Sequence, residues 1–265
     1  MCLIIFSYKS HPRYNLILAA NRDEFYGRPT REAQFWDRHP DLLAGKDLEA
    51  GGTWMGINKG GQFSAITNYR EPDKRDPGAP TRGKLVLNYL QHNEDPYTYL
   101  ERINGKAYRY NGFNLLTGNV NRLYYLSNKK EGIDELSSGI YGLSNHLLNT
   151  PWPKVLKAQK HLKEITKNES FNHDALFELL ADDTKADPDN LPDTGVPPEW
   201  EHILSPIFIK SEEYGTRCST VLTIDKNDQV HFEERTFDPE SHEISNISSF
   251  EFELERLTDS AIRDK

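Results

Sequence analysis

Two apolar runs at the start of the chain are separated by a polar stretch, as the strands of a β-hairpin are. Residues 2–8 and 14–20 are rich in Leu, Ile, Ala and aromatic side chains. Because almost every position in both runs is apolar, we predict a hairpin that is buried on both faces. A second hairpin is predicted for residues 53–58 and 62–68, since the glycines of the turn between them permit a positive φ angle.

The hydrophobic pattern changes to helical spacing in the middle of the chain and returns to strands near its end. Helices are predicted for residues 82–91 with Thr81 as N-cap, for a segment that follows Asp95-Pro96, and for residues 153–167 and 171–180. Further strands are predicted for residues 112–118, 122–127, 219–224, 229–236 and 248–255.

This order of strands, helices and strands predicts an α+β fold with sheets built from antiparallel hairpins. The length of 265 residues suits one well-cored domain, so we expect residues 1–265 to form a single domain. Residues 186–200 are rich in proline, which predicts a long loop that either covers a site or is disordered.

The composition excludes several classes of protein. A net charge of −9 argues against binding to nucleic acid, and no apolar run is long enough to span a membrane. Two cysteines are too few for a disulfide framework, and the first residues do not read as a signal peptide, so we expect a cytoplasmic protein. The nine histidines show no metal-ligand spacing and no phosphate-binding loop is present, so we expect no metal and no cofactor.

Cys2 is the first candidate for chemistry. If Met1 is removed, Cys2 carries both a thiol and a free α-amine, so that one residue supplies a nucleophile and its base. A cysteine at this position is more often simply a small buried residue. Hairpin geometry adds weight to the chemical interpretation, because antiparallel pairing places residue 2 opposite about residue 21.

The residues at that point are Asn21, Arg22, Asp23 and Glu24. A carboxylate there can accept a hydrogen bond from the ammonium or thiol group of Cys2, and Arg22 can favour the thiolate. The alternative is a solvated strand end. The second hairpin ends at Asn68, whose amide is a plausible oxyanion donor, while Trp54 suits a pocket wall.

Several sequence blocks in this order resemble the NRDE family, which includes the transport and Golgi organisation protein 2 of animals. The blocks are Met1-Cys2, Asn21-Arg22-Asp23-Glu24, Gly51-Gly52-Thr53-Trp54-Met55-Gly56, Gly142-Leu143-Ser144-Asn145-His146 and Thr216-Arg217-Cys218-Ser219-Thr220. That family in turn is similar to the N-terminal-nucleophile (Ntn) hydrolases of the cysteine type, the bile-salt and penicillin V acylases. The resemblance implies a four-layer αββα sandwich, with two antiparallel sheets between helix layers.

The resemblance also implies roles for individual residues. Cys2 matches the nucleophile, Asp23 the carboxylate that holds the α-amine, and Asn68 the oxyanion donor. Asn145 and Arg217 match a later Asn and a late Arg of the acylases. The sequence departs from the acylases at Ala20, where they carry Arg, and Arg22 lies two places further along. This departure affects which charged groups set the pKa of the Cys2 thiol.

Two functions are compatible with these residues. The first is an Ntn-type amidohydrolase that acts on a linear amide or thioester of a small acyl compound. The second is a non-catalytic binding or carrier protein that holds haem or an acyl-CoA in the same pocket. The expected ligand contacts are Asn21, Arg22, Glu24, Trp54, Tyr69 and His146. His146 has a further interpretation, as a partly buried hydrogen-bonding residue.

Overall fold

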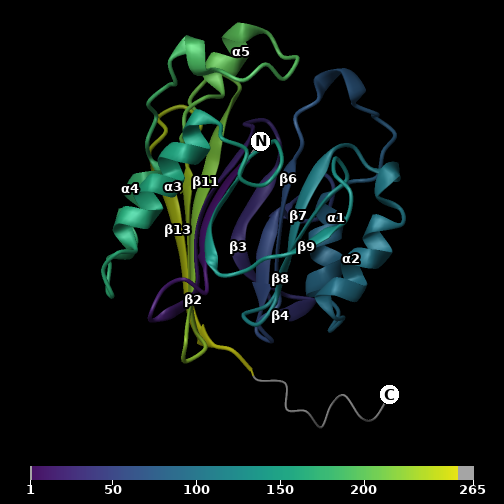
Figure 1. Cartoon of the computed structure of the whole chain (residues 1–265), viewed down its shortest axis with the longest axis vertical. Coiled ribbons are helices and arrows are strands. Elements are labelled where there is room, and N and C mark those ends of the chain that lie inside the picture. Colours follow the sequence, from purple (N-terminus) through teal and green to yellow (C-terminus); the bar gives the residue numbers. More distant parts are fainter. Residues whose placement is uncertain (1, 256–265) are drawn as a thin grey trace.

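Residues 2–255 are described by a computed structural model, in which two antiparallel sheets lie face to face (Figure 1). The first sheet has the strand order β10-β1-β2-β11-β12-β13. Its strands are β1 (Cys2–Tyr8), β2 (Tyr14–Phe25), β10 (Gly139–Leu143), β11 (Tyr214–Asp225), β12 (Gln229–Phe237) and β13 (Ile244–Glu253).

The second sheet follows the chain order without a crossover, from β3 to β9. Its strands are β3 (Thr30–Trp36), β4 (His39–Asp47), β5 (Met55–Asn58), β6 (Phe63–Asn68), β7 (Phe113–Gly118), β8 (Leu123–Ser127) and β9 (Ile133–Glu135). The chain passes into this sheet directly after β2. It returns to the first sheet at β10, which pairs with β1.

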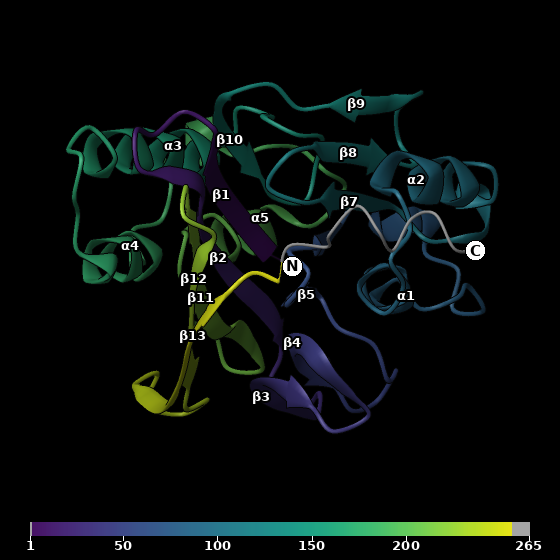
Figure 2. The ribbon, with the colours of Figure 1, turned by 90° about the horizontal axis from the view of Figure 1, so that it is seen from below.

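Helices cover the outer faces of both sheets (Figure 2). They are α1 (Gly83–Leu90), α2 (Pro96–Asn104), α3 (Pro153–Ile165), α4 (His173–Leu180) and α5 (Pro198–Ile203), with short 3₁₀ turns at Pro72–Lys74, Ala107–Arg109 and Pro188–Asn190. Helices α1 and α2 pack on the second sheet, and α3 and α4 pack on the first. The molecule is therefore an αββα sandwich of four layers, which confirms the predicted α+β class.

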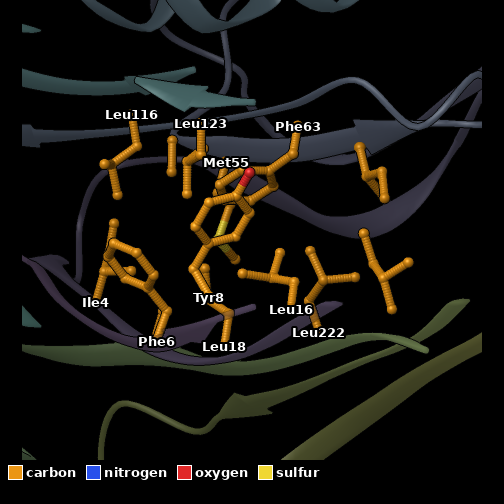
Figure 3. Packing of buried hydrophobic residues seen from close by; sticks show 14 of the residues in the cluster. Ile4, Phe6, Tyr8, Leu16, Leu18, Met55, Phe63, Leu116, Leu123 and Leu222 are labelled. Atoms are coloured by element: carbon orange, nitrogen blue, oxygen red, sulfur yellow. The ribbon is translucent and has the colours of Figure 1, made fainter. Parts of the chain in front are cut away.

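The two sheets share an apolar layer to which β1 and β2 contribute alternate residues. Ile4, Phe6 and Leu18 face the second sheet, whereas Leu3 and Ala19 face helices α3 and α4. Figure 3 shows side chains of the two sheets meeting across this layer. Full burial of each Leu, Ile or Phe contributes roughly 1.5–3 kcal/mol relative to exposure. Because β1 is buried on both faces, apolar residues on either face contribute to its stability, in agreement with the continuous apolar run of its sequence.

The predicted elements are present with shifted ends, and some strands were not predicted. Strand β2 runs to Phe25, five residues beyond the predicted end, because polar residues continue the ladder between β1 and β11. Strands β3 and β4 were missed because bulges interrupt their pairing and charged residues mask the alternation. The predicted N-cap Thr81 was wrong, since α1 begins after Arg82 without a side-chain cap.

The proline-rich segment 186–200 is folded. It forms a 3₁₀ turn and the start of α5, and its Thr194 amide and hydroxyl both donate hydrogen bonds to the Glu201 carboxylate. It does not line the main cleft of the described chain. Neither predicted alternative, a cover over the site or a disordered loop, describes it.

Within residues 2–255, no helix is both long and apolar enough to cross a membrane.

Candidate active site

The main cleft lies where one end of β1, β2 and β11 faces β3, β4 and β6 of the opposite sheet. It has a volume of about 250 Å³ and is lined mainly by polar residues. Six basic side chains line it, namely Arg22, Arg28, Arg31, Lys46, Arg82 and Arg217. Five acidic residues line it as well, namely Asp23, Glu24, Glu32, Asp47 and Glu234. Trp54 and Ile66 are the large apolar side chains among the lining residues.

Cys2 reaches this cleft through the register of three strands. It pairs with Arg22 across β1 and β2, and Arg22 pairs in turn with Cys218 on β11. Directly paired residues point to the same face of a sheet, so the three side chains form a row that faces the second sheet. The predicted register, with residue 2 opposite residue 21, was therefore wrong by one position.

The Cys2 thiol is buried, and burial raises its pKa above the ordinary value. The negative charge of Asp23 raises it further, while Arg22 and a hydrogen bond from the Asp23 main chain lower it. Because burial dominates, the thiol is protonated at neutral pH. It becomes a nucleophile only if a base removes its proton as it attacks.

Asp23 lies next to Cys2, and hydrogen bonds to β11 fix its position. Its Oδ1 atom accepts a hydrogen bond of 2.8 Å from the Thr216 hydroxyl, and its main-chain oxygen accepts one of 3.0 Å from the Tyr214 hydroxyl. Thr216 pairs directly with Asp23 across β11 and β2, and the register shifts immediately after it, between Thr216 and Cys218. Burial raises the pKa of Asp23, and Lys154 is the strongest influence in the opposite direction.

Asn68, at the end of β6, faces the cleft from the second sheet. Its main-chain oxygen accepts a hydrogen bond of 2.8 Å from Nδ2 of Asn145. The neighbouring Ser144 hydroxyl donates to the main-chain oxygen of Cys2 at 3.1 Å. The segment 144–145 thus links β1 to the strand that carries Asn68. Asn145 itself is fully buried and does not line the cleft.

Arg217 lines the cleft, but its guanidinium is occupied by the turn after β2. Nη1 donates to the main-chain oxygens of Phe25, Tyr26 and Arg28 at 2.9, 3.1 and 3.0 Å. Arg28 is in turn paired with Asp47 at 2.7 Å. Through these contacts Arg217 holds the turn after β2 in place at the wall of the cleft.

Arg22 differs from Arg28, Arg82 and Arg217, whose guanidinium groups all have partners. Its side chain is 8% exposed and lines the cleft, yet within residues 2–255 it has no hydrogen-bond or ion-pair partner. Ala20, where the acylases carry Arg, faces the layer between the sheets two residues before Arg22. A displacement of two residues along a strand keeps the arginine on the same face.

Three predicted ligand contacts lie elsewhere. Asn21 points to the helix-covered face, where its amide donates to the main-chain oxygens of Leu180 and Ile207, both at 2.9 Å. Tyr69 and His146 hydrogen-bond each other at 2.6 Å outside the cleft. Asn21 was misassigned because alternation sends it to the face opposite Arg22. His146 has the hydrogen-bonding role that was its second interpretation.

The remaining predicted contacts, Glu24 and Trp54, line the cleft. Cleft residues that the prediction missed include Arg82 and Glu234. Glu234 sits at a buried position of β12, where its carboxylate accepts hydrogen bonds from the Ala33 amide at 2.7 Å and the Cys218 thiol at 3.4 Å. The sequence signal was present, since Glu234 interrupts the alternating apolar face of its strand. In the described residues no cluster of His, Cys, Asp and Glu has the geometry of a metal site.

Known proteins resemble the chain in sequence and fold. The family described as Transport and Golgi organisation 2 matches residues 1–239. The mouse Transport and Golgi organization 2 homolog is 34% identical over 276 aligned positions, covering 96% of this chain and all of the relative. The bovine homolog is 36% identical over 257 positions, covering 89% and 93% of the two chains.

One solved structure with a similar fold is the C2A mutant of the conjugated bile acid hydrolase from Clostridium perfringens. It superposes with a TM-score of 0.51 at 8% identity, over 95% of this chain and 92% of the hydrolase. At this identity the likeness concerns the fold, and it confirms the sandwich that the sequence resemblance implied. The family match over residues 1–239 and the 34% identity with the mouse relative show that the chain belongs to the Transport and Golgi organisation 2 family.

Proposed function

We propose that the protein is an N-terminal-cysteine hydrolase that cleaves a linear amide or thioester of a small acyl compound. The observation that carries the proposal is the row formed by Cys2 and Arg22 at the cleft, with Asp23 beside it and Asn68 across it. Cys2 needs a base because its thiol is protonated at neutral pH. Its own α-amine, once Met1 is removed, is a base with an ordinary pKa of about 7.7–8.0.

In the proposed reaction the α-amine takes the thiol proton as the sulfur attacks the acyl carbon. The Asn68 amide donates a hydrogen bond to the oxyanion. When the tetrahedral intermediate collapses, the bond to the leaving nitrogen or sulfur breaks and the leaving group takes the proton. Water then attacks the thioester on Cys2, and its proton returns through the amine to the sulfur. Asp23 accepts a hydrogen bond from the amine and orients it.

The cleft also supports a statement about the substrate. A guanidinium at the wall of a cleft that has no protein partner can bind a carboxylate or phosphate, because its donors are free. Arg22 is such a group and lies beside Cys2. We propose that the substrate carries an anionic group close to the scissile bond, and that Trp54 and Ile66 contact its apolar part.

The direct test uses the full chain after intact mass has shown that Met1 is absent. N-acyl amino acids and acyl thioesters of increasing chain length are incubated with it, and released acid is measured by mass spectrometry. We expect turnover that Cys2→Ala abolishes without lowering the unfolding temperature, and an acyl adduct on the Cys2 peptide. Cys218→Ala is the matched control and should retain turnover. Equal turnover in the Cys2→Ala variant would remove Cys2 from the mechanism.

The partnerless Arg22 also favours a second candidate, a binding protein for haem or an acyl-CoA, both of which carry anionic groups. Under this proposal Cys2→Ala leaves the affinity for either ligand within twofold, as measured by titration calorimetry. A large loss of affinity in Cys2→Ala would argue against it.

Two wider proposals accompany the function. We propose that the whole chain works as one domain, because the two sheets share one buried apolar layer. We also propose a cytoplasmic location, because Cys2 and Cys218 are both free thiols and a nucleophilic thiol persists in a reducing compartment.

A further inference from the structure

Cys2 and Asn68 line the same cleft but belong to different sheets. Cys2 begins β1 of the first sheet, and Asn68 ends β6 of the second. The distance between the thiol and the Asn68 amide therefore depends on how the two sheets are held together at this point. Residues 144–146, which follow β10 and are called the connecting segment below, contact both strands.

The connecting segment forms a series of hydrogen bonds with the end of β6. The Thr67 hydroxyl donates to the main-chain oxygen of Ser144 at 2.6 Å. Nδ2 of Asn145 donates to the main-chain oxygen of Asn68 at 2.8 Å, and the Arg70 amide donates to the main-chain oxygen of Asn145 at 2.7 Å. Asn145 thus holds the main chain at Asn68 and again two residues later.

The same segment is attached to the first sheet. Leu143, the residue before it, pairs with Ile4 across β10 and β1. The Ser144 hydroxyl donates to the main-chain oxygen of Cys2 at 3.1 Å. Two adjacent residues of the connecting segment therefore join the main chain of Cys2 to that of Asn68.

The position of Asn145 separates two possible roles in the reaction. An oxyanion donor must reach the space where the substrate binds. The Asn145 side chain is 0% exposed, lies outside the set of described residues that line the cleft, and directs its Nδ2 atom to the main chain of Asn68. A buried amide bonded in this way fixes the geometry of its neighbours.

We propose that Asn145 is a positioning residue that keeps the Asn68 amide at a fixed distance from the Cys2 thiol, by holding the end of β6 against β1. The inference rests on the proposed function and deepens it, because it assigns to Asn145 a role other than the one that the acylase resemblance suggests. Asn145 acts through Asn68 and does not touch the oxyanion. Its effect on the reaction should therefore disappear when residue 68 has no amide to donate.

A double-mutant cycle tests this dependence in the full chain without Met1. Asn145→Ala should lower kcat about 10–100-fold at nearly unchanged KM, because a displaced oxyanion donor loses contact with the transition state. In the Asn68→Ala background the same substitution should cause no further loss. Losses that multiply would make Asn145 an independent oxyanion donor and would overturn the proposal.

A second readout requires no substrate. In ¹⁵N spectra of the full chain, the side-chain amide signals of Asn68 are identified by their loss in Asn68→Ala. Asn145→Ala should shift these signals and should speed solvent exchange of the Arg70 amide about fivefold, the effect of one weakened hydrogen bond. Asn58→Ala is the matched control, because Asn58 is also buried and donates to a main-chain oxygen, that of Leu90, at 3.1 Å. It should leave both measurements unchanged.

Unmoved Asn68 signals in folded Asn145→Ala would refute the proposal. If Asn145→Ala does not fold, Ser144→Ala takes its place, since it detaches the connecting segment from Cys2 and keeps Asn145. The Asn68 signals should then shift as well, and unchanged signals would again contradict the positioning role. A failed hydrolase proposal shows as absent turnover with the spectral shifts intact, so the two failures give different results.

Discussion

The two faces of β2 carry charge in opposite ways. On the cleft face, Arg22 is buried without a partner in the described chain, next to a protonated thiol. Away from the cleft, Arg70 is paired with Glu201, and Asp23, the next residue of β2, accepts a hydrogen bond from Thr216. Charges that stabilise the fold are matched by neighbours, whereas a binding site leaves a charge for its ligand. On this basis Arg22 is the charge for which we propose a ligand.

The largest expected effect on stability concerns the buried ion pair of Arg70 and Glu201. Glu201→Leu should lower the free energy of unfolding by about 3–5 kcal/mol, because it leaves Arg70 buried without its carboxylate. Urea unfolding measures the change. Arg70→Met combined with Glu201→Leu should recover much of it, since no charge is then left unpaired. Arg102→Met, which breaks the exposed pair with Glu94, is the control and should cost less than about 1 kcal/mol.

On the cleft face, Asn68 is expected to affect the reaction and leave the fold intact. Its side chain lines the cleft and has no hydrogen-bond partner within residues 2–255. Asn68→Ala should lower kcat about 10²–10³-fold at nearly unchanged KM, because an oxyanion donor acts mainly in the transition state. Steady-state kinetics on the best acyl substrate measure the split. A rise in KM with kcat unchanged would assign Asn68 to ground-state binding instead.

Substitution of Arg22 should have a smaller effect, and that effect should fall on ligand affinity and leave stability intact. Arg22→Met should weaken an anionic ligand about 10–100-fold, the loss expected for hydrogen bonds to a charged group. The unfolding free energy should stay equal or rise, because a buried charge without a partner is removed. Titration calorimetry with an acyl-CoA or a substrate that is not turned over measures affinity, and Arg31→Met on the exposed rim is the control. A clear loss of stability would show that Arg22 has a structural partner.

The sequence predicts the neighbourhood of Cys2 better than its details. Hairpin pairing alone brings Cys2 close to residues 21–24, and the second hairpin ends at Asn68. The face of each residue depends on an exact register, which the turn at residues 9–13 determines, and Lys9 adopts a positive φ of 49° there. A slip of one residue exchanges the faces, which is why Asn21 was expected in the cleft.

The charges behind β2 are harder to predict, because they come from segments far apart in the chain. Lys154, Arg70 and Glu201 meet only after α3 of the first sheet's helix layer, the end of β6 in the second sheet and α5 have come together. Lys154 offers a local signal, since it lies beside the apolar residues of its helix, but its hydrogen-bond acceptor, the main-chain oxygen of Leu204, comes from a distant segment. Tertiary packing therefore decides this part of the site.

The smallest expected effect concerns Glu234. This residue lines the cleft, but its carboxylate already accepts hydrogen bonds from the Ala33 amide and the Cys218 thiol. Burial raises its pKa above the ordinary 4.5, while the Ala33 amide, the Cys218 thiol and Arg22 act in the opposite direction. Since the pKa is higher in the folded state, the folded protein binds more protons between pH 4.5 and the folded pKa, and stability falls as pH rises through that window. Glu234→Gln removes this dependence. The stability of the wild type relative to Glu234→Gln should therefore fall as pH rises from 4.5, measured by urea unfolding at several pH values with the exposed Glu251→Gln as control. A difference that grows with pH would mean that Arg22 and the donors outweigh burial, which would make Arg22 a partner of Glu234 and remove the contrast between the two faces.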